Sequence, residues 1–588
     1  MGLKTPLKIS DRLNAIRTPV LFVAIGLVCQ LLFLNCSQFV TGTLGIASTT
    51  ARPALRKNCT APATRGTGNQ AARRLTKDEV VNTFYDLFTY IMVEKPKVFD
   101  AIASLPDDTF AYQAVNFNPY VQSGFADGIF RTSEALVNEL RYNAVRFNIY
   151  GSCTNDSTIQ KSCFEAFIRN FGRKVWRRPL TTEEQNEFVT AFWNSNGLAP
   201  FETSLTVMLA SPEFLTLSEE RGVAGAKKKL SQYEIAARIA YMTTGSTPDD
   251  QLSSAADQQE LQTLDQVKSQ VTRLISTSRG KDRLTKSVIH YVGAEKIFDP
   301  YEQAAYAARL PLGTNRGYAL GLGEELKDEL KNFIRYVVFE QNGSYHDLMS
   351  SPAVFPTTDR VAKIYGTTVY QQGQPPPRAP ASERAGLWSR AALLATSDTH
   401  TKPFSRGVQY MKRILCRSLP SPDPAVIASR ITVINSLSPL QYSNRDIHRL
   451  ITEPRACMGC HAELNPIGFG LERFNELGQH RTAELVLDAN ADILATHPID
   501  GSVELNIGGI KTSTSSVDSF FSLLTENDEA SACFAETVFA ERRYRVSAPA
   551  DDCLLSEVQG GLSNTKPILS VFVDSIANED IFWNGSGS

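Results

Sequence analysis

Two cysteines and a histidine form the pattern Cys-x-x-Cys-His at Cys457, Cys460 and His461. This spacing offers two thiols that can add to the two vinyl groups of haem, followed by an imidazole that can bind the iron. With 10 Cys and 7 His in 588 residues, chance would give the pattern only about 0.002 times per chain. The motif therefore predicts one covalent haem c, with His461 as the proximal iron ligand.

The same residues could instead form a redox-active dithiol or half of a zinc site followed by an incidental histidine. A zinc site would need a second Cys-x-x-Cys pair, and the sequence contains none. Haem remains the favoured prediction. We expect the second ring nitrogen of His461 to donate to a carbonyl or carboxylate, because such a partner orients a metal-bound imidazole.

The sixth coordination position of the iron has several candidates. His400 lies in a polar turn before a helical stretch, where it could be a distal ligand or a catalytic base. His480 is a second candidate. Met411 falls in a helical stretch where a core position is more typical, and Met458 lies inside the attachment turn, from which it cannot readily reach the distal face.

Two further groups near the motif could bind charged ligands. Arg406 could hold a haem propionate through its fork of donors, or could form a surface ion pair. Asp488, Asn490 and Asp492 alternate like the start of a calcium loop, but the later Gly and Glu are missing. We therefore expect a turn there, and no metal other than iron.

The N-terminus has the features of an export signal. Lys4, Lys8, Arg12 and Arg17 precede an apolar run over residues 20–34, which is short for a membrane-spanning helix. The run ends in Leu-Asn-Cys at Cys36, similar to the site where bacterial lipoproteins are cleaved and lipidated. We expect a lipid-anchored periplasmic or outer-membrane protein of a bacterial cell envelope; an uncleaved anchor and plain secretion are the alternatives.

Six cysteines remain after the leader and the haem motif are set aside. Export favours disulfides, and the natural local pairs are Cys153–Cys163 and Cys533–Cys553, which leaves Cys59–Cys416. Sequence alone allows 15 connectivities for six cysteines, and some could be buried free thiols. The composition is globular, with a net charge of -2 from 60 basic and 62 acidic residues, so no global field favours nucleic acid.

Helical signals dominate the folded part of the chain up to about residue 350, so we predict a mainly α, multi-domain fold. Capping boxes begin at Thr76, Thr181 and Ser231. Apolar residues within 325–339 recur on one face of a helix. We expect a small β-hairpin element near 485–511 and renewed helix from Val517.

The expected domain organisation follows from these signals and from a Pro-rich stretch at 374–380 that suits a linker. The predicted parts are a signal peptide with its lipobox (1–36), a flexible tether (37–70), an N-terminal helical domain (71–140), a second (141–225) and third (226–370) helical domain, a Pro-rich linker (371–383), a cytochrome c-like haem domain (384–484) and a C-terminal domain (485–588).

From about residue 70 to 585 the chain resembles a family of exported bacterial proteins made of consecutive planctomycete-type domains around a planctomycete cytochrome c domain. The matching segments are 72–76, 82–83 and 86–87 for the first domain, 176–181 and 210–215 for the second, 233–234, 248–252 and 362–366 for the third, and 384–387, 403–407, 457–461 and 465–474 for the cytochrome-like domain. The family pattern has Asp where this chain has Asn465, and usually an aromatic residue where it has His480, followed by the matching Arg481. The resemblance implies a haem-bearing envelope protein and leaves its reaction unassigned.

Three functions fit these features. The first is a monohaem redox protein that exchanges single electrons with an unidentified envelope partner. The second is a haem peroxidase or oxygenase acting on an extracytoplasmic substrate, with His400 as acid/base and Arg406 stabilising negative charge. The third is a binding platform with a structural haem, suggested by the bulk of the helical domains. The sequence leaves open whether the protein is an enzyme.

Overall fold

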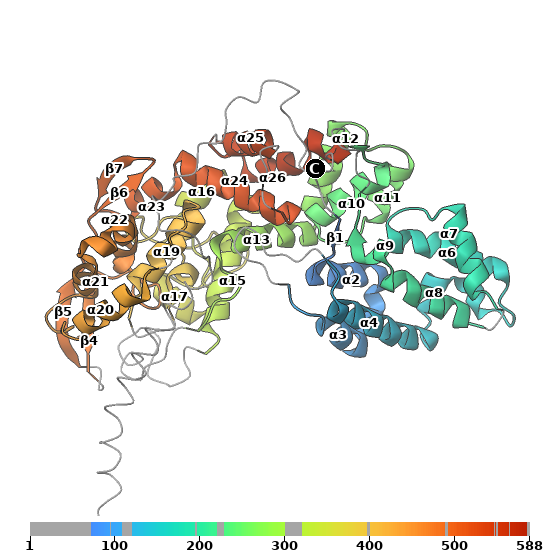
Figure 1. Ribbon diagram of the computed structural model, residues 1–588, viewed down its shortest axis with the longest axis horizontal. Coiled ribbons are helices and arrows are strands. Elements are labelled where there is room, and N and C mark those ends of the chain that lie inside the picture. The colour runs from blue at the N-terminus through green and yellow to red at the C-terminus, as the bar shows by residue number, and fades with distance from the viewer. Residues whose placement is uncertain are drawn as a thin grey trace, which may run out of the picture.

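The computed structural model describes most of the chain after residue 71. The described residues are 72–94, 96–108, 120–194, 197–219, 228–299, 320–396, 400–420, 422–488, 492–545, 547, 551–563 and 565–584. They are mainly helical, with four short two-stranded antiparallel sheets, which confirms the predicted fold class (Figure 1). The predicted signal peptide, the lipidation site Cys36, the tether and Cys59 lie outside the described residues.

The N-terminal lobe comprises the described residues from 72 to 219. Its elements are β1 (Arg73–Arg74), α2 (Lys77–Glu94), α3 (Pro96–Ala103), α4 (Ser123–Arg141), α5 (Arg146–Tyr150), η3 (Ser152–Asn155), α6 (Lys161–Trp176), α7 (Thr182–Phe192), α8 (Ala199–Ala210), α9 (Pro212–Leu215) and β2 (Thr216–Leu217). Reciprocal hydrogen bonds at Thr76 and Thr181 confirm two of the predicted capping boxes. The lobe has its own hydrophobic core, which includes nine phenylalanine rings.

A second group of helices follows the N-terminal lobe. Its elements are β3 (Lys228–Lys229), α10 (Gln232–Thr243), α11 (Asp250–Asp257), α12 (Leu264–Ile275), α13 (Ser278–Val292), α15 (Leu322–Arg335), η4 (Tyr336–Glu340), α16 (Tyr345–Ser350) and α17 (Asp359–Tyr365). Ser231 caps α10 as predicted. The amphipathic pattern near 325–339 forms α15 and continues as a π-helical turn in η4.

The stretch from 387 to 514 covers the predicted haem domain and the start of the predicted C-terminal domain, and it contains short helices and two hairpins. Its elements are η5 (Leu387–Ser389), α18 (Ala391–Leu394), α19 (Pro403–Ile414), α20 (Pro424–Ile434), α21 (Asn444–Thr452), α22 (Arg455–Gly470), η6 (Leu471–Arg473), β4 (Ala483–Leu487), β5 (Ile493–Pro498), β6 (Val503–Ile507) and β7 (Ile510–Thr514). The sequence predicted one hairpin element here, and the structure has two, β4–β5 and β6–β7. Asp488 and Asp492 are hydrogen-bonded across the β4–β5 turn.

The chain ends in helices that return to the middle of the molecule. These elements are α23 (Val517–Thr525), α24 (Asp528–Arg543), α25 (Asp552–Ser563), α26 (Ile568–Ile576), η8 (Glu579–Phe582) and β8 (Trp583–Asn584). Strand β8 pairs with β3, and α24 and α26 pack on α13 and α12 (Figure 1). Helix resumes at Val517, as predicted. One hydrophobic core therefore includes buried residues from Leu230 through to Phe582.

The Pro-rich stretch is packed against this core. The backbone of Val354 donates to Pro377 (2.9 Å), that of Ala379 donates to Pro352 (3.0 Å), and Ala379 is buried. These bonds hold the stretch beside the loop that follows α16, so it lies on the folded body of the protein.

The disulfides agree only in part with the predicted pairs. Cys153 and Cys163 are bonded to each other, as expected from their local spacing. Cys416 is bonded to Cys533, so the predicted pairs Cys533–Cys553 and Cys59–Cys416 are wrong. Cys553 is disulfide-bonded as well. The reason is tertiary: the end of α19 packs on α24, which brings Cys416 and Cys533 to a Cα separation of 5.4 Å.

Among the described residues, none of the helices combines the length and the apolar character needed to cross a membrane.

Candidate functional site

Helix α22 carries the Cys-x-x-Cys-His motif in its first two turns. Cys457, Cys460 and His461 are spaced i, i+3 and i+4, so they share one face of the helix. All three side chains are partly exposed. Both cysteines are free thiols, whereas Cys153, Cys163, Cys416, Cys533 and Cys553 are disulfide-bonded. The free pair is therefore open to chemistry from the solvent side of α22.

The imidazole of His461 is hydrogen-bonded to Asn465, which lies one turn further along α22. Its Nδ1 lies 2.8 Å from Asn465 Oδ1. Asn465 Nδ2 in turn donates to Thr452 Oγ1 on α21 (2.8 Å). Burial lowers the pKa of His461, and the hydrogen bond to Asn465 opposes that shift. The lowered pKa favours the neutral imidazole, which is the form that binds metals.

A second histidine, His448 on α21, lies in the same neighbourhood. The ring of Phe404 packs edge-on against His448 and His461, with centroid distances of 4.7 and 4.5 Å. His448 Nδ1 bonds to the carbonyl of Asn444 (2.7 Å). Burial lowers the pKa of His448, and this effect outweighs the hydrogen bond to the Asn444 carbonyl and the nearby Glu472 carboxylate, which raise it. His448 is thus a neutral imidazole beside the motif.

Two glycines allow α19 to cross α22 closely enough to place Phe404 there. A Cβ on Gly468 would lie 2.3 Å from the carbonyl oxygen of Pro403, and one on Gly407 would lie 2.7 Å from Leu464. Only glycine permits this backbone approach. The crossing therefore sets the distance between Phe404 and the motif.

A buried carboxylate ties the start of α19 to the start of α21. Glu472 is 1% exposed and accepts hydrogen bonds from Thr401 (2.7 Å) and from the Asn444 amide (3.1 Å). Arg481, the residue that matches the family pattern, donates to the same carboxylate (3.2 Å). This network fixes the backbone from which Phe404 and His448 extend.

Helix α20 is apolar, yet none of its residues is buried. Val426, Ile427, Ile431 and Ile434 all remain partly exposed. The helix packs on α21, next to the motif-bearing α22 (Figure 1). An apolar helix in a folded protein normally buries its apolar stripe, so α20 leaves apolar surface uncovered beside α21. A large apolar group attached to α22 would fit this arrangement.

The other predicted site residues are distributed as follows. His400 is exposed, in the segment leading to α19. His480 is half-buried against Phe474, and burial lowers its pKa. Met411 is 1% exposed, in the core position that its helical context indicated, and Met458 is 40% exposed on α22.

Arg406 is buried (3% exposed), so the surface ion pair considered for it is wrong. Its terminal nitrogens donate to the carbonyls of Leu471 (3.2 Å), Phe474 (2.8 Å) and Asn475 (2.7 Å). The Arg406 guanidinium therefore stabilises the segment that follows α22.

Sequence reasoning missed His448, Phe404 and Thr452. Phe404 lies in the segment 403–407 that resembles the family, but the resemblance gave it no role. For His448 the signal was a histidine in an amphipathic stretch thirteen positions before His461, and that spacing does not predict contact. Their proximity arises because a two-residue connection, Glu453-Pro454, folds α21 back against α22.

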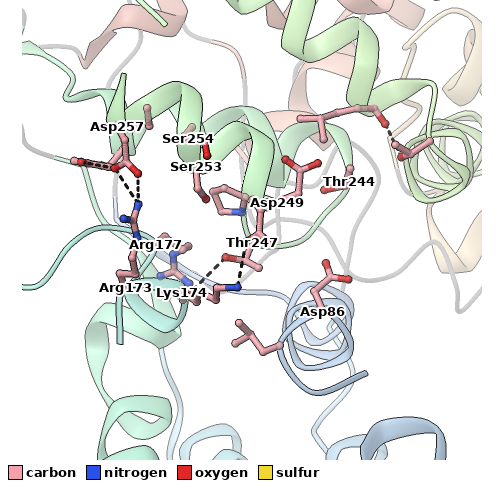
Figure 2. Close-up of a pocket in the computed structure, with 18 of the residues that line it drawn as sticks. Asp86, Arg173, Lys174, Arg177, Thr244, Thr247, Asp249, Ser253, Ser254 and Asp257 are labelled. Carbon is pink, nitrogen blue, oxygen red and sulfur yellow. Dashed lines mark hydrogen bonds and ion pairs between the residues drawn. The ribbon is translucent and has the colours of Figure 1, made fainter. Parts of the chain in front are cut away.

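A cavity of about 660 Å³ lies between the N-terminal lobe and α10 to α13 (Figure 2). Charged side chains pair across it: Arg173 with Asp257 (2.9 Å) and Lys174 with Asp250 (3.1 Å). These ion pairs join α6 of the N-terminal lobe to α11, so the cavity lies where the two cores meet. The paired charges leave no excess of one sign to attract a charged ligand.

Within the described parts of the chain, no cluster of three or more His, Cys, Asp or Glu side chains could hold a metal ion. The motif on α22 is different in kind, since it offers two thiols and one imidazole from a single helix face, the set that covalent haem attachment requires.

Three protein families match parts of the chain. Residues 163–219 match PSD5, a protein of unknown function (DUF1595), residues 230–367 match PSD4, a protein of unknown function (DUF1592), and residues 384–484 match PSCyt3, a protein of unknown function (DUF1588). The fold is that of a mainly helical protein, and the matches divide it into several domains. The name of one of them, PSCyt3, hints at a cytochrome. The three planctomycete-type domains fit the multi-domain family that the sequence resembles. Comparison with curated proteins and with solved structures gave no match.

Proposed function

We propose that this protein is an exported c-type monohaem redox protein that transfers single electrons in a bacterial cell envelope. Cys457 and Cys460 would hold the haem through thioether bonds, and His461 Nε2 would bind the iron. Bound haem would supply reversible one-electron exchange at its iron. The residues around the motif orient the imidazole through Asn465 and flank it with Phe404.

One observation carries the proposal. In a chain whose other described cysteines are disulfide-bonded, the two motif thiols are free and share a helix face with the imidazole of His461. The uncovered apolar side chains of α20 add a surface that a porphyrin would cover.

The disulfides and the charged, apolar N-terminus together support export and a lipid anchor at Cys36. The redox partner would be another envelope component. The peroxidase alternative receives less support, because the terminal nitrogens of Arg406 donate to backbone carbonyls.

Expression of the full chain in cells with intact cytochrome c maturation machinery tests the proposal. The expected product is coloured after denaturing electrophoresis, has the added mass of one haem, and is reduced and reoxidised reversibly without binding carbon monoxide. The double variant Cys457→Ala/Cys460→Ala should lose the covalent haem. Gly459→Ala is the matched control, since a Cβ there meets nothing within 4 Å.

A colourless wild-type protein of unmodified mass would refute haem attachment. Carbon monoxide binding with peroxide-dependent turnover that disappears in His400→Ala would instead favour the enzymatic alternative.

A further inference from the structure

A three-residue hydrogen-bond relay ends at the imidazole of His461. From the far end, Thr452 Oγ1 donates to the carbonyl of His448 (2.8 Å), one turn back in α21. Asn465 Nδ2 donates to Thr452 Oγ1 (2.8 Å), and Asn465 Oδ1 lies 2.8 Å from His461 Nδ1. Thr452 and Asn465 are 4% and 8% exposed, so water has little access to replace these bonds.

The direction of the relay follows from its first member, because a carbonyl oxygen can only accept. Once the Thr452 proton is directed at that carbonyl, Oγ1 can only accept from Asn465. The amide must then turn Nδ2 toward Thr452 and Oδ1 toward His461. The remaining partner, Nδ1 of His461, has to donate.

The opposite direction would need Thr452 to donate to Asn465 and Asn465 to donate to His461. That arrangement abandons the bond to the helix carbonyl, so it contains one hydrogen bond fewer in a buried place. Buried polar groups that lose a partner are costly. The observed geometry therefore selects one direction.

We infer that Thr452 and Asn465 fix His461 as the Nδ1–H tautomer, leaving Nε2 with its lone pair, and that the neutral Asn465 acceptor sets the electron donation of this imidazole. Nε2 makes no hydrogen bond among the described residues, which agrees with that role. The expected effect on the midpoint potential rests on the proposed function, because it requires bound haem. The tautomer of His461 is a property of the polypeptide and does not require haem. Asn465 and Thr452 are positioning residues.

The tautomer can be measured without haem. Selective ¹⁵N labelling of the seven histidines in the full-length Cys457→Ala/Cys460→Ala variant should show a protonated Nδ1 and an unprotonated Nε2 for His461, assigned by its loss in His461→Gln. Thr452→Val should convert part of this signal to the Nε2–H form or to fast exchange. An Nε2–H tautomer in the parent variant would overturn the inference.

The midpoint potential provides the second measurement. Asn465→Asp places a carboxylate against Nδ1–H, which makes the imidazole a stronger donor and stabilises the oxidised iron. We expect the reduction equilibrium to fall about tenfold, equivalent to about 59 mV for a one-electron couple. Asn465→Leu removes the acceptor and should raise the midpoint potential. Thr452→Val should raise it by a smaller amount.

Thr525→Val is the matched control. Thr525 is also buried and also donates to a carbonyl one turn back, that of Phe521 (2.8 Å), but it lies on α23 outside the relay. The midpoint potential of the Thr525→Val variant should equal that of the wild type. Equal potentials in Asn465→Asp and Asn465→Leu, or shifts of one sign in both, would overturn the role of Asn465. A protein without haem would refute the proposed function, and the tautomer measurement would still decide the relay.

Discussion

At the scale of single residues, the features that the sequence predicted correctly are those that depend on nearby residues in the chain. The Cys-x-x-Cys-His pattern, the capping threonines and the local disulfide Cys153–Cys163 depend on neighbours within a few turns, so the sequence predicted them. Long-range partners were not predictable in that way. Glu79, for example, caps its own helix as the sequence indicated, but it also forms an ion pair with Arg73, which stacks on the Tyr544 ring at 4.1 Å.

We predict that the Glu79 carboxylate makes stability depend on acid pH. Burial opposes its ionisation, but Arg73 and the Thr76 amide outweigh burial and lower the pKa of Glu79 below its ordinary value of 4.5. Its contribution is therefore fully present above about pH 4.5 and is lost as the pH falls toward the folded-state pKa. At pH 7, Glu79→Gln should lower the unfolding free energy by roughly 3–5 kcal/mol.

Thermal unfolding of the wild type and of Glu79→Gln between pH 7 and pH 3 checks this prediction. The difference in Tm should narrow as the pH falls. Glu187→Gln, an exposed position in α7, should leave the pH profile unchanged. A Tm difference that is constant over this range would contradict the assignment.

At the scale of elements, helix packing determines the surroundings of the motif. Amphipathic patterns predicted the helices, including the stretch that became α15, but the patterns do not say which helices cross. The α19–α22 crossing depends on Gly407 and Gly468, where the backbone of one helix meets the other. Glycines inside a helical pattern are ambiguous in sequence, because a close approach and mere tolerance look alike.

We predict that Gly468→Ala destabilises the protein and disturbs the site. The added Cβ would lie 2.3 Å from the Pro403 carbonyl oxygen, so α19 must shift and Phe404 with it. A cost of about 1–3 kcal/mol is expected for such overpacking. Gly459→Ala in the same helix meets nothing within 4 Å and should be neutral or slightly stabilising. Urea unfolding curves of the two variants measure the difference, and equal midpoints would contradict the prediction.

At the scale of the whole molecule, segments distant in sequence complete one core. Strand β8 pairs with β3, and Arg390, the residue just before α18, forms a fully buried ion pair with Glu329 on α15 (3.1 Å). The disulfide Cys416–Cys533 spans 117 residues and fastens α19 to α24. Domains that look consecutive in sequence therefore share a core after folding.

We predict that this long-range disulfide contributes more to stability than the local one. Closing a longer loop removes more entropy from the unfolded chain, and a loop of about 100 residues corresponds to roughly 4.7 kcal/mol in the chain-entropy account. Cys416→Ala/Cys533→Ala should therefore lower the Tm more than Cys153→Ala/Cys163→Ala, whose separation is 10 residues. Calorimetry of both double variants makes the comparison, and a larger loss from the local pair would oppose this account.

The sequence alone determined the mainly helical class, the helix starts at Thr76, Thr181 and Ser231, and the haem-type motif, because each depends on interactions between residues close together along the chain. Only the tertiary structure decided that Cys416 bonds Cys533, that Phe404 and His448 lie beside His461, and that Asn465 is oriented by Thr452. These contacts depend on which helices cross and at what distance. That choice is made by the packing of the complete core, which no local pattern encodes.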